Sequence, residues 1–451
     1  MDRHIAVIFI AMGIGLAAVL CRADTFQAPE SPGPSSPHQP ERLLAATQWG
    51  GHLRTAGTVA WPDRQSRPLW ENEPNLYDGF LQLRLKNDLF FGSNWTFQTH
   101  YEAVAMAGDT LEKSHQWQEQ WPNSPVVDML AFTVIDDDRR LMDLTHVIHD
   151  DVRDVVYHRL DRLNLTLTRP WGMVRLGRQA LTWGNGLVFH PMDLFNPFAP
   201  TAIIKEYKTG DDMAMAQLPI GLTGNLQALY LPRRNPATTD VEWDQSSLAG
   251  KWHLSTNTIE MDAMVAHHFA DTVIGIGATG YFRNAAWRTD LTWSFLDGNG
   301  SPGGYLSAVA NIDYAWTWWN KNSYGFLEFY FNGLGTNDFG NISDNVELMK
   351  RIGRGELFVL GRTYLAGEWQ IEVHPLVRIS LTTINNLADP SGLIQPQIVW
   401  DMTTNVQLIA GVRWHYGEEN SEFGGYRLRF FDNNVILSPS NSAFLQLTRY
   451  F

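Results

Sequence analysis

Residues 370–382 read QIEVHPLVRISLT, and they alternate between apolar and polar side chains. The odd-numbered positions carry the apolar set: Ile371, Val373, Val377, Ile379 and Leu381. Polar residues such as Glu372 and Arg378 occupy most of the positions between them. Because successive side chains of a strand point to opposite faces, this stretch predicts a β-strand with one apolar face and one polar face.

The same pattern recurs along the chain from about residue 47, in about 16 to 18 segments separated by Gly, Asn, Asp and Pro. Clear examples are residues 81–86, 162–167, 287–293 and 407–415. The polar faces carry many charges, and the apolar faces carry Trp, Tyr and Phe near the ends of the segments. An outer-membrane barrel needs a polar interior and aromatic girdles. Residues 46–451 therefore predict an all-β, transmembrane antiparallel β-barrel of about 18 strands, with 16 as the alternative count.

Composition excludes several other classes of protein. The 451 residues include 34 Lys and Arg against 48 Asp and Glu, a net charge of −14, so there is no basic excess with which to bind nucleic acid. After residue 20 no stretch approaches the roughly 20 apolar residues of a spanning helix. The single cysteine, Cys21, excludes an internal disulfide and a cysteine-based metal site. We found no catalytic nucleophile with a base in reach and no cofactor fingerprint, so we expect no enzyme, no cofactor and no metal.

The first residues predict export from the cytoplasm. A short charged start, an apolar centre and a small residue at Ala23 predict a signal peptide over 1–23. Lipidation of Cys21 is the alternative, but bulky Leu20 precedes it. Residues 24–45 are rich in proline and predict an extended linker.

The last strand is distinctive. Residues 443–451, AFLQLTRYF, alternate and end on Phe451. This segment resembles the closing strand of bacterial outer-membrane barrels, whose terminal aromatic residue is recognised by the barrel-assembly machinery. The resemblance implies the outer membrane of a Gram-negative bacterium, with membrane lipid and that machinery as partners. Arg449 departs from the aromatic residue usual two places before the end.

A second resemblance covers residues 171–212. This part contains RLGRQALTWGNG (175–186), PMDLFNPFAP (191–200) and KEYKTGDD (205–212), and it resembles porin-like barrels of the alginate-export type. The resemblance implies 18 strands and an electropositive lumen for an anionic polymer or small solute. The loop 191–200 is apolar, and its prolines constrain it. We therefore expect it to fold into the lumen or over a mouth of the barrel. The candidate constriction residues are Asp193, Asn196, Lys205 and Tyr207.

Charge placement predicts the substrate path. Acidic residues concentrate in the predicted loops, whereas the polar strand faces carry a small excess of cations over carboxylates. The candidate lumen residues are Arg84, Lys86, Arg162, Arg175, Arg178, Gln179, Arg288, Arg378 and Arg413. Arg178 would face lipid unless Gly177 opens a β-bulge, so we expect either a bulge there or a position near the rim of the barrel. The connection 109–157 is long, and the spacing of its apolar residues 141–148 predicts a short helix that covers or enters the pore.

Two functions remain open. The first is a passive channel for a polar solute or polymer, with an anionic one expected, because positive sites inside a low-dielectric wall attract anions. The second is a non-conducting structural barrel, filled by ion pairs across strands, which serves an export machine and has a periplasmic export complex as a partner. The segment 171–212 would then be a packing motif without a ligand.

Overall fold

The computed structural model describes residues 46–66, 70–120, 122, 137–195, 197–200, 207–297, 303–427 and 436–451. The predicted signal peptide and linker lie outside these residues, as do the side chains of Asn196 and Lys205.

The chain forms a closed antiparallel barrel of 18 strands, which confirms the predicted fold class and strand count. The strands, in order round the wall, are β1 (Ala46–Trp61), β2 (Leu76–Phe91), β3 (Trp95–Gly108), β5 (Asp154–Arg169), β6 (Gly172–Gln179), β7 (Asp211–Ile220), β8 (Gly224–Leu231), β9 (Ser247–Ser255), β10 (Ile259–His268), β11 (Asp271–Phe282), β12 (Ala285–Phe295), β13 (Gly304–Trp318), β14 (Lys321–Asn332), β15 (Thr363–His374), β16 (Val377–Asn386), β17 (Ser391–Thr403), β18 (Val406–Tyr416) and β21 (Asn441–Tyr450).

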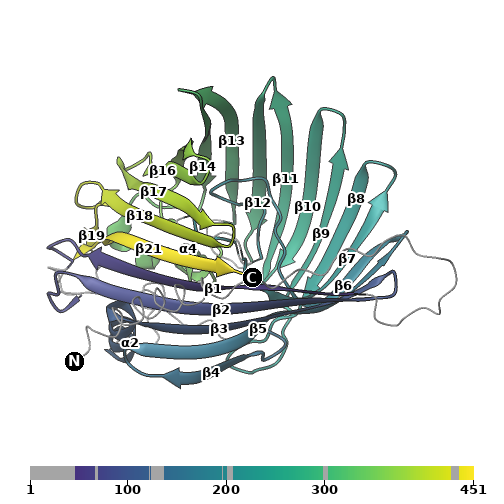
Figure 1. Ribbon diagram of the computed structural model, residues 1–451, viewed down its shortest axis with the longest axis horizontal. Helices are drawn as coiled ribbons and strands as arrows, with labels where there is room; N and C mark the ends of the chain where they lie inside the picture. The colour runs from purple at the N-terminus through teal and green to yellow at the C-terminus, as the bar shows by residue number, and fades with distance from the viewer. Residues whose placement is uncertain are drawn as a thin grey trace.

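The first and last strands close the barrel. β1 pairs with β21 in a register that sets Gly57 opposite Leu445, and Figure 1 shows these two strands side by side. The backbone N–H of Phe451 donates to the carbonyl of Gly51 over 3.1 Å, and the N–H of Gly51 donates to the carbonyl of Phe451 over 2.9 Å. The pairing leaves no free edge between the two ends of the sheet.

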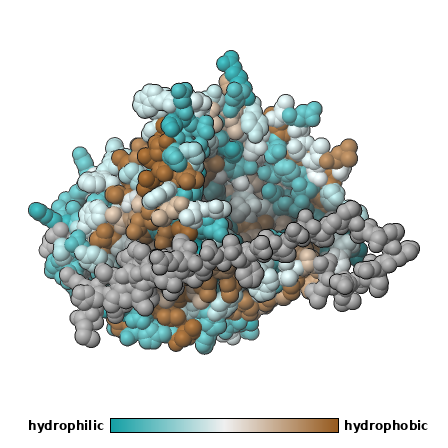
Figure 2. Space-filling model, viewed as in Figure 1, coloured by the Kyte–Doolittle hydropathy of each residue, from teal (hydrophilic) through white to brown (hydrophobic). Residues whose placement is uncertain are grey.

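The wall is apolar outside and polar inside. On β12, Leu291 and Trp293 are 40% and 39% exposed, whereas Asp290 and Thr292 between them are 1% and 3% exposed. Figure 2 shows hydrophobic side chains in patches on the outer wall and hydrophilic ones within the hollow. A soluble protein would bury the first set and expose the second, so the alternation suits a wall surrounded by lipid.

The two ends of the barrel differ. At one end, the turn end, neighbouring strands are joined by two or three residues, as at 92–94, 221–223 and 319–320. The other end, the loop end, carries the long connections, which span 109–153, 180–210, 333–362 and 417–440. In outer-membrane barrels short turns face the periplasm and long loops face outward. The stretch 370–382 is not one strand, because a turn at Pro375 and Leu376 divides it between β15 and β16.

The long connections carry short elements. These are α2 (Asp109–Gln120), β4 (Thr145–Asp150), the 3-10 helix η2 (Phe339–Asp344), α4 (Val346–Gly353) and the hairpin of β19 (Tyr426–Arg427) with β20 (Ile436–Leu437). No helix among the described residues is long and apolar enough to span a membrane.

The helix predicted at 141–148 is wrong. Residues 145–150 form β4, which pairs with β5 beyond the end of β6, and the helix of this connection is α2. Trp117 of α2 packs in one buried cluster with Phe339 and Leu348 of the 333–362 connection. These two connections therefore pack together at the loop end.

Candidate functional site

The connection between β6 and β7 spans residues 180–210. Its described residues, 180–195, 197–200 and 207–210, run inside the barrel and are called the inward segment below. Its first anchor is Trp183, whose indole N–H donates to the Oε1 of Gln227 on β8 over 2.7 Å. The next is Asn185, whose backbone N–H and side-chain amide both donate to the carboxylate of Asp290 on β12, over 2.6 and 2.7 Å. The segment thus moves away from the strand at which it begins.

The third anchor lies on the far side of the lumen. The backbone N–H groups of Leu187, Val188 and Phe189 donate to the carboxylate of Glu328 on β14, over 2.6, 3.0 and 2.7 Å. The side-chain amide of Asn311 donates to the same carboxylate over 3.0 Å. Successive N–H groups that converge on an anion form a backbone nest. Since β14 lies eight strands round the wall from β6, the inward segment crosses the lumen.

An apolar patch on the wall supports this crossing. Trp183, Met192 and Phe195 of the inward segment form a buried cluster with side chains on neighbouring strands, namely Met213, Met215, Leu229, Leu231, Ala249, Met264, Ala266 and Val273. Gly277 on β11 allows the close approach, because a Cβ there would lie 2.7 Å from the side-chain nitrogen of Asn185. The patch has a signal in the sequence: near the loop end these strands carry apolar residues on the inner face as well as on the outer face, as expected where both sides are covered.

Asp193, in the middle of the inward segment, pairs with a residue near the end of that segment. Its carboxylate accepts from the Lys208 ammonium over 2.6 and 2.7 Å. Burial raises the pKa of Asp193 to about 6, although Lys208 acts in the opposite direction. Burial likewise lowers the pKa of Lys208. The pair closes a loop within the lumen from residues fifteen positions apart.

A basic cluster lies on the wall beside the inward segment. It consists of Arg54 on β1, Arg84 and Lys86 on β2, and Arg159 and Arg162 on β5. Two carboxylates lie among these five cations. Asp161 accepts from Arg84 and Arg162 over 2.8 and 2.6 Å, and Glu102 on β3 accepts from Arg159 over 2.5 Å. The cations outnumber the carboxylates that pair with them, so this wall has an excess of positive charge.

Tyr207 joins the inward segment to the basic cluster. Its hydroxyl accepts a hydrogen bond from Lys86. The Lys86 ammonium and the Arg84 guanidinium lie 4.2 and 4.6 Å from the centre of its ring, a cation–π arrangement. The structure thus brings together four of the predicted residues, Arg84, Lys86, Arg162 and Tyr207.

The predicted residues on β6 form internal contacts. Arg178 is 1% exposed; it donates to Asp212 over 2.8 Å and forms a 3.0 Å ion pair with Asp137. Its guanidinium also donates to the carbonyl of Met142, so residues 137–142 enclose it. Of the two alternatives expected for Arg178, the bulge at Gly177 does not form, because β5 and β6 pair without a shift of register and Gly177 instead has a φ of +114°. The position near the rim is the one found, since Arg178 lies one residue before the end of β6.

The other predicted cations and Gln179 are spread over the wall. Gln179 donates to the carbonyl of Met213 over 3.0 Å, and Arg175 donates to the hydroxyl of Thr166 over 2.9 Å. Arg288 pairs with Asp313 over 2.6 Å, and Arg413 donates to Gln395 over 3.2 Å. Arg378 is exposed near the turn end, opposite Glu372 in the register of β15 and β16.

Sequence reasoning did not identify the anchors as anchors. Asp290 and Glu328 have the appearance of ordinary lumen carboxylates, and their partners lie 105 and 141 residues away in the chain.

Outside the lumen, one exposed group in the described part of the chain has the spacing of a cation site. Its members, His149, Asp151 and Asp154, hold their ligand atoms within 4.8 Å of one another at the β4–β5 hairpin. Exposed carboxylates commonly lie this close without an ion.

Comparison with known proteins identifies the fold. No family model matches the chain, and no curated protein matches its sequence. Among solved structures, Acinetobacter baumannii OccAB1 aligns with 91% of this chain and 97% of its own, at 8% identity and a TM-score of 0.50. Pseudomonas aeruginosa OprD aligns over the same shares at 7% identity and a TM-score of 0.50. The chain therefore has the 18-stranded barrel fold of outer-membrane porins.

Proposed function

We propose that this barrel is a passive channel of the outer membrane that conducts polar solutes and prefers anions. The observation that carries the proposal is the inward segment, which crosses the lumen between β6 and Glu328 and is joined to the basic cluster through Tyr207. A solute that passes the segment meets a wall with excess positive charge. Positive sites inside a low-dielectric wall concentrate anions and disfavour cations.

The same proposal places the chain in a Gram-negative cell envelope. Lipid would cover the apolar outer wall, the segment 1–23 would direct export, and the assembly machinery would recognise Phe451. The fold of OccAB1 and OprD supports a channel rather than an enzyme. The resemblance of residues 171–212 is the only support for alginate as the transported polymer. Much of this stretch forms contacts within the protein itself.

The test is ion selectivity of the purified protein in a planar bilayer. The reversal potential under a KCl gradient should show an excess of chloride permeability. Lys86→Gln should lower the chloride-to-potassium permeability ratio by about two- to fivefold, since one lost cation changes the local potential by an energy on the order of 1 kcal/mol. Lys321→Gln, at an exposed position near the turn end, is the matched control.

A cation-selective channel, or a Lys86→Gln variant as selective as the wild type, would contradict the role of the basic cluster. A protein that conducts nothing would favour the second candidate, a structural barrel that works with an export complex. The observation behind that candidate is the set of ion pairs that join nearby strands on the inner face of the wall.

A further inference from the structure

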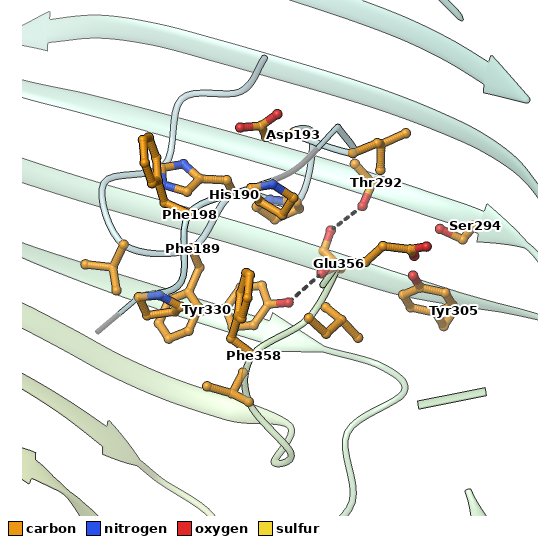
Figure 3. A pocket seen from close by; sticks show the side chains of 18 residues that line it. Phe189, His190, Asp193, Phe198, Thr292, Ser294, Tyr305, Tyr330, Glu356 and Phe358 are labelled. Carbon is orange, nitrogen blue, oxygen red and sulfur yellow. Dashed lines mark hydrogen bonds between the residues drawn. The ribbon is translucent and has the colours of Figure 1, made fainter. Parts of the chain in front are cut away.

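A pocket lies in the lumen between the inward segment and the 333–362 connection. The inward segment contributes residues 188–191, 193–194, 197–198 and 200, and the connection contributes residues 356–359. Strands β12, β13 and β14 form its floor. Including its open side, the pocket holds about 630 Å³ of space. Figure 3 shows its side chains converging from the two connections and the wall.

The floor of the pocket is hydroxylated. Thr292 and Ser294 come from β12, Ser307 from β13 and Tyr330 from β14. Thr292 donates to the carbonyl of Ser307 over 3.4 Å, and Ser307 donates to the hydroxyl of Tyr330 over 3.2 Å. A hydroxyl has one donor and two acceptor sites, so these bonds leave further sites for a ligand. The register sets Thr292 opposite Ser307, which makes the hydroxyls a row across adjacent strands.

The opposite side of the pocket is aromatic. Phe189 stacks on Tyr330 with ring centres 4.3 Å apart and planes 7° apart, which holds both rings in place. Phe198 and Phe358 add two rings from the two connections, and Phe358 is 42% exposed. In Figure 3, Phe189, Phe198 and Phe358 lie on one side, and Thr292, Ser294 and Tyr305 lie on the other.

The charges that border the pocket are neutralised within the protein. Glu356 lies 3.5 Å from Arg354 and 3.5 Å from His268. Asp193 is held by Lys208. A charged ligand would therefore find its counter-charge already engaged. The pocket offers hydroxyls on one side and ring faces on the other.

We propose that this pocket binds an uncharged, polyhydroxylated ring, that is, a sugar of about one ring in size. The hydroxyls of such a ring exchange hydrogen bonds with the row on β12–β14, and its C–H face packs against the aromatic side. The proposal does not rest on channel activity. A barrel that conducts nothing would still have the pocket. A barrel that conducts ions but binds no sugar would contradict sugar binding and leave the channel proposal intact.

The experiment is saturation-transfer difference NMR on the full-length protein in micelles of a detergent without a sugar headgroup. D-glucose is the probe, and D-mannitol is the open-chain comparison. We expect saturable transfer to glucose protons and weaker transfer to mannitol. Thr292→Val and Phe358→Ala should each weaken glucose binding about three- to tenfold, the effect of one lost hydrogen bond or contact of similar strength.

Two matched controls separate the pocket from the rest of the wall. Thr382→Val removes a threonine whose hydroxyl bonds Glu368 on another part of the wall, and Phe282→Ala removes an exposed ring near a turn. Both should leave glucose binding unchanged. Phe358 is already partly exposed, so its variant tests the site even if Thr292→Val fails to fold. No saturable transfer, equal transfer to mannitol, or binding that neither pocket variant weakens would overturn the proposal.

Discussion

A single carboxylate, that of Glu328, holds the middle of the inward segment. It is buried and accepts three backbone N–H groups and one side-chain amide. A buried charge is stable only when donors replace its lost hydration. The N–H groups of the inward segment stabilise the buried charge of Glu328, and the carboxylate in turn holds the inward segment in place. This side chain fixes the middle of the inward segment on the far wall.

Glu328→Gln keeps the shape of the side chain but turns an NH2 group toward the N–H donors. The lost charge-assisted bonds should weaken the anchor by about 1–3 kcal/mol. We expect larger and noisier single-channel steps in planar bilayers. Glu372→Gln, at an exposed position near the turn end, should leave the steps unchanged. Steps of wild-type size and noise in Glu328→Gln would show that other contacts hold the segment.

Asp193 should give the protein a pH-dependent stability. Its folded pKa of about 6 lies above the ordinary value of 3.8. The folded state therefore takes up this proton first, and the contribution of Asp193 to the free energy of unfolding grows as the pH falls from about 6 toward 4. Urea unfolding in micelles, followed across that range, should show a smaller slope with pH for Asp193→Asn. Asp151→Asn, at the exposed β4–β5 hairpin, should keep the wild-type slope.

At the scale of elements, β6 ends early and other parts of the chain complete the wall. β4 takes its place beside β5, and residues 137–142 enclose the ion pair of Arg178 with Asp212. The helix expected at 141–148 was wrong because short apolar runs fit a helix and a strand equally well. Pairing with β5, which lies later in the sequence, decides between them.

Arg178→Ala should destabilise the barrel by about 3–5 kcal/mol, because it leaves the buried carboxylate of Asp212 without its ion pair. Asp137 keeps its 2.8 Å ion pair with Arg140. The unfolding midpoint in urea, followed by tryptophan fluorescence, measures the loss. Arg283→Ala, an exposed arginine at the turn between β11 and β12, should shift the midpoint little. A double variant, Arg178→Ala with Asp212→Ala, should recover part of the loss. A single variant as stable as Arg283→Ala would mean that the ion pair contributes nothing.

For the whole molecule, alternation along the chain was enough to predict a barrel of about 18 strands, with 16 as the alternative count. A period of two is a local property, and lipid outside with solvent inside makes it strong in nearly every strand. The interior was less predictable. The positions of Arg84, Lys86 and Arg162 in the basic cluster follow from strand faces. The anchors on Asp290 and Glu328 join residues more than a hundred positions apart. Local patterns carry no information about such contacts.

The distance between these anchors along the chain has a consequence for biogenesis. The inward segment leaves β6, yet it docks on β12 and β14, which are translated later. Its native position cannot exist until those strands have joined the growing sheet, since long-range contacts form only after their partners are in place. A partly assembled barrel that lacks β12 and β14 would therefore lack the crossing that narrows the finished lumen.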